Sequence, residues 1–252
     1  MEIKEYTINT LSEYLDAILK EKDQHKKLWF RGHNSKDYQL LPTVYRKPYT
    51  WKDETVFLHQ FKARSIRFLD KIPVNNIEWL FVMQHYKTPT RLLDWTESAI
   101  VALSFATQFN MVADSGATIW CLDPVKLNEK TRFSQFEYEP IPNICEYTDL
   151  CQMFESQRID YPLAIMGPQN TDRIIAQKGV FTLFPNKEAF SMESLQYADE
   201  FLVKININKK VVEDIKKDLY YIGISETVLF PELESVSKEI IRDYSLKGVK
   251  NV

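Results

Sequence analysis

Apolar residues recur at helical spacing along much of the chain and predict its helices. The first helix follows a Thr-Leu-Ser-Glu capping box at residues 10–13 and is expected over residues 10–22. A small-residue helix is expected to begin at Thr96 and to run to about Gln108. Further helices are expected near residues 52–70, 75–86, 148–156, 170–177, 210–221 and 232–244. Gly179 is expected to be the C-terminal stop of the fourth of these six.

Shorter apolar runs, rich in β-branched and aromatic residues, predict the strands. They lie at residues 27–31, 117–122, 164–165, 179–184 and 200–207. A further run, residues 227–230, is expected to be a strand that stops at Pro231. Helices dominate the first half and strands the second, so we expect an α+β fold with helices packed around a mixed or mostly antiparallel sheet. No repeat or long linker divides the chain, which predicts a single domain over residues 1–252.

The composition narrows the class of protein. Hydrophobic residues make up 44% and charged residues 27%, a balance typical of globular chains and not of disordered ones. The net charge of −3 argues against a general nucleic-acid binder. The N-terminus does not resemble a signal peptide, and no apolar run is long enough to cross a bilayer. We therefore expect a cytoplasmic protein with no membrane contact.

Several kinds of chemistry are disfavoured by missing motifs. The three cysteines, Cys121, Cys145 and Cys151, show no metal-ligand spacing with any histidine, so we expect reduced thiols and no metal. Glycine-rich phosphate loops, nucleophile elbows and paired-histidine zinc motifs are also missing. Kinases, serine hydrolases, metalloproteases and Rossmann dehydrogenases are therefore disfavoured.

Residues 84–96, QHYKTPTRLLDWT, carry the densest group of candidate functional side chains. So many polar and aromatic groups around one turn are costly to fold unless they satisfy each other or a ligand. His85 is a candidate acid–base group or a satisfied core histidine. Asp94 is spaced to contact a ligand, to pair with an arginine or to cap the following helix. The ligand-binding candidates of this segment are Gln84, Tyr86, Thr90, Arg91, Asp94, Trp95 and Thr96.

Arg31 stands near the end of an upstream apolar run, LWFRGH at residues 28–33. A guanidinium in that setting must be paired, either in a structural salt bridge or as a fork that grips a phosphate or a carboxylate. Gly32 lets another group approach closely, and Trp29 offers an aromatic surface. His33 is a second candidate acid–base histidine.

Two later segments add candidates. Arg173 and Gln177 are four residues apart and share a helix face, which either lines the same cleft or is simply exposed. Glu226 precedes the apolar run at 227–230 and has no evident helix-capping role. We expect these side chains, Arg31 and the 84–96 segment to converge on one anionic ligand.

With these segments assembled, the chain resembles the FRG-domain family, which is named for a Phe/Tyr-Arg-Gly motif. The matching segments are Phe30-Arg31-Gly32, Leu41-Pro42 with Arg46, and residues 84–96, 162–185 and 229–238. Lys87 is a departure, because the family usually has glycine there. The family recurs in bacterial and phage-related genes, so the resemblance implies a toxin or an anti-phage defence role.

A weaker similarity to ADP-ribosyltransferases implies a mechanism. In that comparison Arg31 holds NAD, the Asp94-Trp95-Thr96 segment replaces the Ser-Thr-Ser strand of those enzymes, and Glu226 is the catalytic carboxylate. A carboxylate of this kind stabilises the oxocarbenium-like species formed when the nicotinamide–ribose bond breaks. Trp29 or Tyr86 would stack on the nicotinamide. The Ser-Thr-Ser triplet itself and the common Glu-x-Glu spacing are both missing.

The sequence thus predicts an ADP-ribosyltransferase-like fold and a protein that uses NAD as a substrate. It would act as an ADP-ribosyltransferase or an NAD glycohydrolase through Glu226, Arg31 and His85, with a macromolecular acceptor or an antitoxin as partner. One alternative is a non-enzymatic sensor of a dinucleotide or another phosphorylated ligand. Nucleic-acid binding is a second alternative, which the acidic net charge disfavours.

Overall fold

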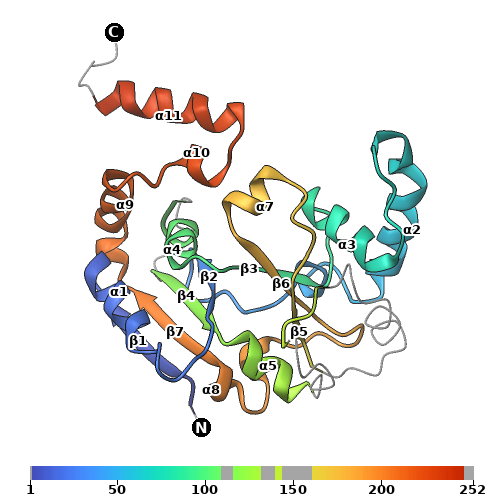
Figure 1. Cartoon of the computed structure of the whole chain (residues 1–252), viewed down its shortest axis with the longest axis horizontal. Helices are drawn as coiled ribbons and strands as arrows, with labels where there is room; N and C mark the ends of the chain where they lie inside the picture. Colours follow the sequence, from blue (N-terminus) through green and yellow to red (C-terminus); the bar gives the residue numbers. More distant parts are fainter. Residues whose placement is uncertain (1, 109–115, 132–139, 144–160, 247–252) are drawn as a thin grey trace.

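The protein is built around one mixed β-sheet, seen in a computed structural model that describes residues 2–108, 116–131, 140–143 and 161–246 (Figure 1). The strands are β1 Lys4–Ile8, β2 Trp29–His33, β3 Leu92–Thr96, β4 Ala117–Leu122, β5 Leu163–Ile165, β6 Gly179–Leu183 and β7 Leu202–Ile207. Their order across the seven-stranded sheet is β1-β7-β4-β2-β3-β6-β5. The pair β1–β7 is parallel, and the other neighbouring pairs are antiparallel. The prediction of a mixed, mostly antiparallel sheet with helices around it is confirmed.

The helices lie on both faces of the sheet and beyond its edges (Figure 1). The α-helices are α1 Leu11–Leu19, α2 Asp53–Ser65, α3 Asn76–His85, α4 Ala99–Gln108, α5 Pro124–Lys130, α7 Asp172–Ala176, α8 Ala198–Phe201, α9 Val212–Tyr221, α10 Glu226–Leu229 and α11 Leu233–Leu246. Short 3-10 turns are η1 Thr43–Tyr45, η2 Ile66–Phe68, η3 Met192–Ser194 and η4 Lys209–Val211. Within the described residues, none of these helices is both long and apolar enough to span a membrane.

Successive side chains of β2 point to opposite faces of the sheet, as the two-residue period of a strand requires. Phe30 belongs to a cluster of buried side chains with residues of α1, α4 and α9. Trp29 belongs to a second cluster on the opposite face, together with Trp95 and Trp120. β2 is the middle strand of the sheet and is therefore packed on both faces. This position gives the residues at the end of β2 a rigid support.

Gly32 allows β2 to lie unusually close to α4. A β-carbon placed on Gly32 would collide with the carbonyl oxygen of Ala102 and would lie 2.8 Å from the amide nitrogen of Ala106. The close approach predicted at Gly32 is therefore made by the backbone of a helix. Glycine at this position lets α4 pack directly on the sheet.

Four element predictions differ from the structure or lie outside it. Residues 227–229 of the run expected to be a strand belong to the short helix α10, and Phe230 follows as its C-cap, because Ser225 has the extended backbone of an N-cap and a helical turn follows it. The small-residue helix starts at Ala99, since residues 92–96 belong to β3. The stop of α7 is Lys178, whose φ is 47°, and Gly179 already belongs to β6. The helix expected at 148–156 lies outside the described residues.

Candidate functional site

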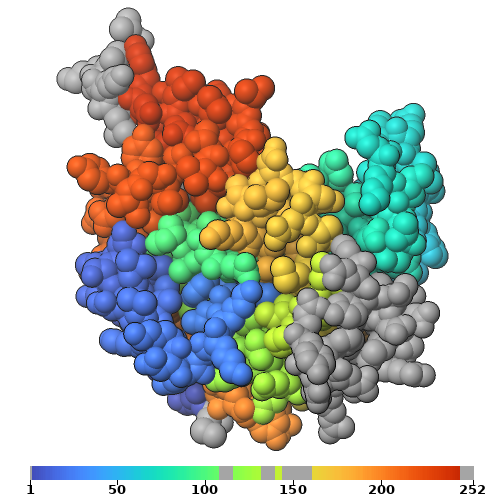
Figure 2. Space-filling view, viewed as in Figure 1, coloured from blue at the N-terminus to red at the C-terminus, as the bar shows by residue number. Residues whose placement is uncertain are grey.

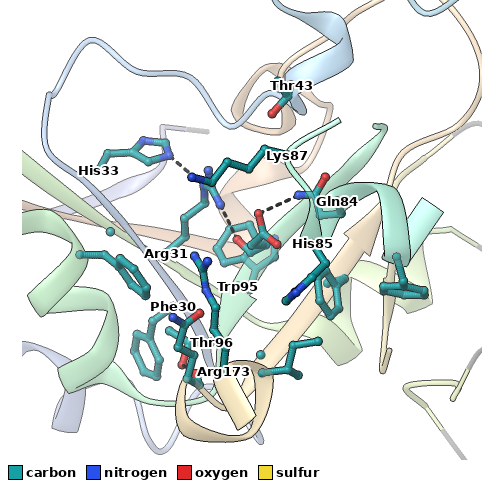
Figure 3. A pocket seen from close by; sticks show the side chains of 18 of the residues that line it. Phe30, Arg31, His33, Thr43, Gln84, His85, Lys87, Trp95, Thr96 and Arg173 are labelled. Atoms are coloured by element: carbon teal, nitrogen blue, oxygen red, sulfur yellow. Dashed lines mark hydrogen bonds between the residues drawn. The ribbon is translucent and has the colours of Figure 1, made fainter. Parts of the chain in front are cut away.

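A cavity of about 510 Å³ opens where β2 and β3 separate (Figure 3). The two strands are paired at Phe30 and Thr96, and the pairing does not extend to Arg31 or Asp94. The cavity is closed by the end of α3, the loop after β2, α7 and the side chain of Phe105 from α4. Residues distant in the sequence thus meet beside the middle of the sheet.

Arg31 supplies the hydrogen bond that a strand neighbour would otherwise give. Its Nη1 donates to the main-chain carbonyl oxygen of Asp94 over 2.6 Å, at the point where the ladder between β2 and β3 ends. Backbone acceptors that leave a ladder need such a partner. The interaction holds the guanidinium at the wall of the cavity, with its Nη2 group not used in any hydrogen bond among the described residues.

His33 fixes the guanidinium of Arg31 from the other side. The Nε of Arg31 donates to Nε2 of His33 over 2.9 Å, and Nδ1 of His33 lies 3.2 Å from the carbonyl oxygen of Tyr38. Nε2 must therefore accept and Nδ1 must donate, which defines a neutral tautomer. Burial, followed by the charges of Arg31 and Arg46, lowers the pKa of His33 to about 3.

Arg46 brings a second guanidinium to the same wall. Its Nε and Nη2 both donate to the carbonyl oxygen of Leu41, over 2.9 Å and 2.6 Å. These bonds orient the guanidinium, and its Nη1 makes no hydrogen bond to another described residue. Burial lowers the pKa of Arg31 to about 10, with Asp94 opposing and Arg46 adding to the effect. Burial also lowers the pKa of Arg46. Both groups remain charged at neutral pH and their charges repel each other.

A chain of three polar side chains crosses the floor of the cavity from Thr90 to Asp94. The buried hydroxyl of Thr90 donates to Oε1 of Gln84 over 2.5 Å. The amide nitrogen of Gln84 then donates to Oδ2 of Asp94 over 2.8 Å. Because a carboxylate only accepts, the Gln84 amide presents its nitrogen to Asp94 and its oxygen to Thr90, and the carboxylate is held in place as a result.

Lys87 adds a third cation from the end of α3. Its φ of 62° is left-handed, and the next amide, that of Thr88, donates back to the carbonyl oxygen of Met83 over 2.9 Å. This is the geometry of a helix C-terminus that favours glycine. The glycine usual in the family is thus explained by the backbone, while this chain places a charged side chain there that lines the cavity.

Arg173 and Gln177 approach the cavity from α7 and connect it to the C-terminal helices. The guanidinium of Arg173 lies over the ring of Phe230 at 4.8 Å from its centroid, and Phe230 packs edge-on against Phe105. The amide nitrogen of Gln177 donates to the carbonyl oxygen of Leu229 over 2.9 Å. The C-terminal helices lie directly against the α7 segment at the surface (Figure 2). This side of the cavity is therefore supported by residues 229–230.

The rest of the lining is largely aromatic. Phe81 and Phe181 meet edge to face with ring centroids 4.8 Å apart, and Phe30, Trp95 and Phe105 complete an apolar surface. The indole N–H of Trp95 donates to Thr182 over 3.0 Å, which fixes the ring. The cavity thus has one cationic part and one aromatic part.

Most of the candidate residues from the sequence meet in this cavity. The ten that line it are Arg31, Gly32, His33, Gln84, His85, Asp94, Trp95, Thr96, Arg173 and Gln177. Thr96 donates its hydroxyl to the carbonyl oxygen of Gln177 over 2.6 Å and accepts from the amide of Ser98, so it also joins α7 to the start of α4. The predicted convergence of Arg31 with the 84–96 segment is found.

Five candidates lie outside the lining. Trp29 is fully buried in the core, and Tyr86 is exposed at 62%. Thr90 acts behind the wall, through Gln84. Arg91 is buried against Glu54, with its Nε 3.1 Å from a carboxylate oxygen, so it forms a structural ion pair.

Glu226 is the fifth, and its expected convergence with Arg31 is not found. Residues 226–229 are helical, and the carboxylate of Glu226 pairs with Arg242 of α11. Arg242 in turn lies over the ring of Tyr220, 3.9 Å from its centroid. Among the described residues that line the cavity, Asp94 provides the one carboxylate.

Sequence reasoning left out several lining residues. Arg46 was noticed only as part of the family pattern, and Lys87 only as a departure from it. Tyr38, Phe81, Phe105 and Phe181 also line the cavity. The phenylalanines sit in apolar helix and strand patterns that predict core positions equally well. No local signal marks them as site residues.

The described residues offer no cluster of three or more histidine, cysteine or acidic side chains that could hold a metal ion. Cys121 is a buried free thiol in β4, and burial raises its pKa well above the usual range. The other two cysteines lie outside the part of the chain that is described.

Comparison with known proteins identifies one family. Residues 26–115 match the family model of the FRG domain, so the chain carries an FRG domain and the resemblance inferred from the sequence is confirmed over this range. The matched range includes Arg31, Arg46, Lys87 and Asp94, whereas Arg173 lies beyond it. No curated protein and no solved structure shows a significant match to the chain.

Proposed function

We propose that the cavity of this FRG domain binds a phosphorylated nucleotide. The observation that supports this best is the charge of its lining: Arg31, Arg46, Lys87 and Arg173 surround a single carboxylate, Asp94. Cations held on one wall repel one another, as Arg31 and Arg46 do, and an anion between them relieves that repulsion. Arginine forks with free N–H groups suit phosphate oxygens, which accept several hydrogen bonds in one plane.

The aromatic part of the cavity supports a nucleotide over a simple anion. The rings of Phe30, Trp95 and Phe105 can contact the faces or edges of a planar base. A volume of about 510 Å³ is also within the usual range of small-molecule sites. A ligand with a charged end and a planar ring would therefore fill both parts.

Our specific proposal for the ligand is NAD, used as the substrate of ADP-ribosyl transfer or of hydrolysis. It rests on the resemblance to ADP-ribosyltransferases and on the presence of a carboxylate beside the arginines. Cleavage of the nicotinamide–ribose bond develops positive charge on the ribose, which a nearby carboxylate stabilises. The carboxylate with access to the cavity is Asp94, and we assign it the role first expected of Glu226.

A sensor that binds the nucleotide without turnover is the second candidate. The location of Glu226, paired with Arg242 outside the lining, favours it because the carboxylate expected from the enzyme comparison does not reach the cavity. A role in toxicity or anti-phage defence fits either candidate and follows from the family resemblance alone. Under the same proposal, the partner of the protein would be a macromolecule that accepts ADP-ribose, or an antitoxin.

The test combines binding with turnover. Calorimetry with NAD and ADP would measure affinity, and chromatography would measure nicotinamide release. We expect Arg31→Lys, which keeps the charge but loses the fork, and Arg46→Ala each to weaken binding about tenfold or more. Arg67→Ala is the matched control, since Arg67 is exposed on η2 outside the cavity.

Three outcomes separate the candidates. Binding with nicotinamide release supports the enzyme, and binding without release supports the sensor. Failure of the folded wild-type protein to bind either nucleotide at millimolar concentration would refute both. If Arg67→Ala and Arg46→Ala weaken nucleotide binding equally, the loss of affinity comes from the change in net charge and not from this cavity.

A further inference from the structure

We propose that Asp94 is the acceptor of a ribose hydroxyl, held for that purpose by Gln84 and Thr90, so that the cavity selects ribonucleotides over deoxyribonucleotides. This inference rests on the proposed function, because it assumes a nucleotide whose phosphate occupies the cationic part. It assigns to one wall of the cavity a preference that no family resemblance provides.

The position of Asp94 needs an explanation, because a carboxylate repels the phosphate that its neighbours attract. Its charge favours the protonated forms of Arg31 and Arg46, but no direct ion pair with a described residue holds it in place. Arg31 bonds to the main-chain oxygen of Asp94, and the carboxylate forms no ion pair with another described residue. Helix capping does not account for it either, since Thr96 accepts the amide of Ser98 at the start of α4.

The hydrogen bonds around Asp94 run in one direction. The oxygen of Thr90 accepts from the amide of Leu92 over 3.2 Å, and its single proton goes to Oε1 of Gln84. The amide of Gln84 must then present its nitrogen to Oδ2 of Asp94. The chain therefore ends in Oδ1, which accepts no hydrogen bond among the described residues and belongs to a side chain that is exposed within the lining.

With no donor from the described residues, this exposed oxygen accepts from water until a ligand supplies a donor. The phosphate is an acceptor, so the donor must come from another part of the same molecule. The guanidinium of Arg31 is bonded to the backbone of Asp94 itself, which places the phosphate fork and the free oxygen on neighbouring groups. In a ribonucleotide the sugar that bears the phosphate also carries hydroxyl donors, so one ligand can meet both groups.

The experiment compares ADP with 2′-deoxy-ADP and 3′-deoxy-ADP by calorimetry, with inorganic pyrophosphate as a probe that lacks a sugar. In the wild-type protein we expect 2′-deoxy-ADP to bind about tenfold or more weakly than ADP, and 3′-deoxy-ADP to bind like ADP, because deoxyribonucleotides lack the 2′-hydroxyl and keep the 3′-hydroxyl. Asp94→Asn keeps the shape of the side chain but lets it present an N–H group to the cavity. We expect this variant to reduce the preference to about threefold or less, with pyrophosphate bound equally or more tightly.

A second pair of variants tests the positioning of Asp94 without altering it. Thr90→Val removes the hydroxyl that orients Gln84, and Thr90→Ser retains it. We expect the sugar preference to fall in Thr90→Val and to persist in Thr90→Ser, while pyrophosphate affinity stays the same in both. A fall in pyrophosphate affinity with an unchanged sugar preference would identify Thr90 as a purely structural residue and would contradict the proposal.

The possible failures are distinguishable. If wild type binds pyrophosphate and all three nucleotides equally, the hydroxyl contact is refuted while the anion site stands. If Asp94→Asn keeps the full preference, Asp94 is not the acceptor. If folded wild type binds none of the probes, the proposed function and this inference fall together.

Discussion

The Nε of Arg31 donates a hydrogen bond to Nε2 of His33 over 2.9 Å, although the two residues belong to the same strand and both belong to the basic amino acids. The contact is compatible only with a neutral imidazole, because a protonated His33 has no acceptor to offer. The neutral histidine orients the arginine without adding a charge. It therefore leaves the attraction for an anion to the guanidinium groups.

Acid should destabilise the protein through His33. Its pKa is about 3 in the folded protein against 6.5 for the free side chain, so the unfolded chain binds a proton first as the pH falls. The contribution of His33 to stability is complete above about pH 6.5 and decreases below it, by about 2 kcal/mol on reaching about pH 5. Protonation would place a charge beside Arg31 and Arg46, opposite the carbonyl of Tyr38.

Urea unfolding of wild type and His33→Gln at several pH values measures this contribution. Glutamine can still accept from Arg31 but does not titrate, so the free energy of unfolding should depend less steeply on pH in the variant. The comparison also removes the effects of other titrating groups. Parallel curves for the two proteins between pH 7 and 5 would contradict the prediction.

Lys87→Gly should raise stability and lower ligand affinity. Glycine relieves the left-handed backbone at this position, which should stabilise the protein by about 0.5–1 kcal/mol. It also removes one of the four cations of the cavity, so nucleotide affinity should fall about three- to tenfold.

Lys87→Ala is the matched control, measured by thermal unfolding and calorimetry. Alanine removes the same charge but keeps a β-carbon in the left-handed conformation. Its affinity should fall as far as that of Lys87→Gly, without the gain in stability. Unchanged affinity in both variants would place Lys87 outside the ligand contacts.

Gly32→Ala should destabilise the protein by about 3 kcal/mol, because the new methyl group would meet the backbone of α4. Gly179→Ala is the control, since the nearest atom to its added β-carbon, Cγ2 of Ile174, would lie 3.4 Å away. Its cost should be below about 1 kcal/mol. Denaturant unfolding of the two variants compares these costs, and equal values would show that α4 can move away from β2.

Glu226→Gln should leave nucleotide affinity and any nicotinamide release within about twofold of wild type, because its carboxylate pairs with Arg242 outside the cavity lining. The loss of this partly exposed ion pair should lower stability by about 1 kcal/mol or less. Asp94→Asn, assayed beside it, should abolish nicotinamide release. Loss of release in a folded Glu226→Gln protein would restore Glu226 as the catalytic carboxylate.

Local patterns predicted the part of the site that depends on local structure. The capping box before α1, the apolar run that ends on Arg31 and the polar turn after α3 all point to real elements. Two of these segments meet because β2 and β3 are neighbours in the sheet. An arginine in an apolar strand, together with a turn rich in polar groups, was sufficient to predict that these segments meet at one cavity.

The remaining parts depend on long-range packing. The run of three apolar residues at 228–230, shortly after Glu226, fits a strand and a helical turn equally well, and the turn directs the carboxylate to Arg242. The edge strand β1, KEYTI, was missed because its residues are mostly exposed and its partner β7 lies far along the chain. The sequence suggests Arg91 as a ligand residue, yet Arg91 pairs with Glu54 of α2, which is distant along the chain.

The parallel strand β1 also has a consequence for handling the protein. Its backbone covers the outer side of β7, whose residues are mostly buried and apolar. Deleting residues 2–8 would leave the backbone amide and carbonyl groups along one side of the apolar strand β7 unpaired, and these groups could pair with a strand of another molecule. Shortened versions of the chain should accordingly precipitate or self-associate, and purification for every assay above should retain the first strand intact.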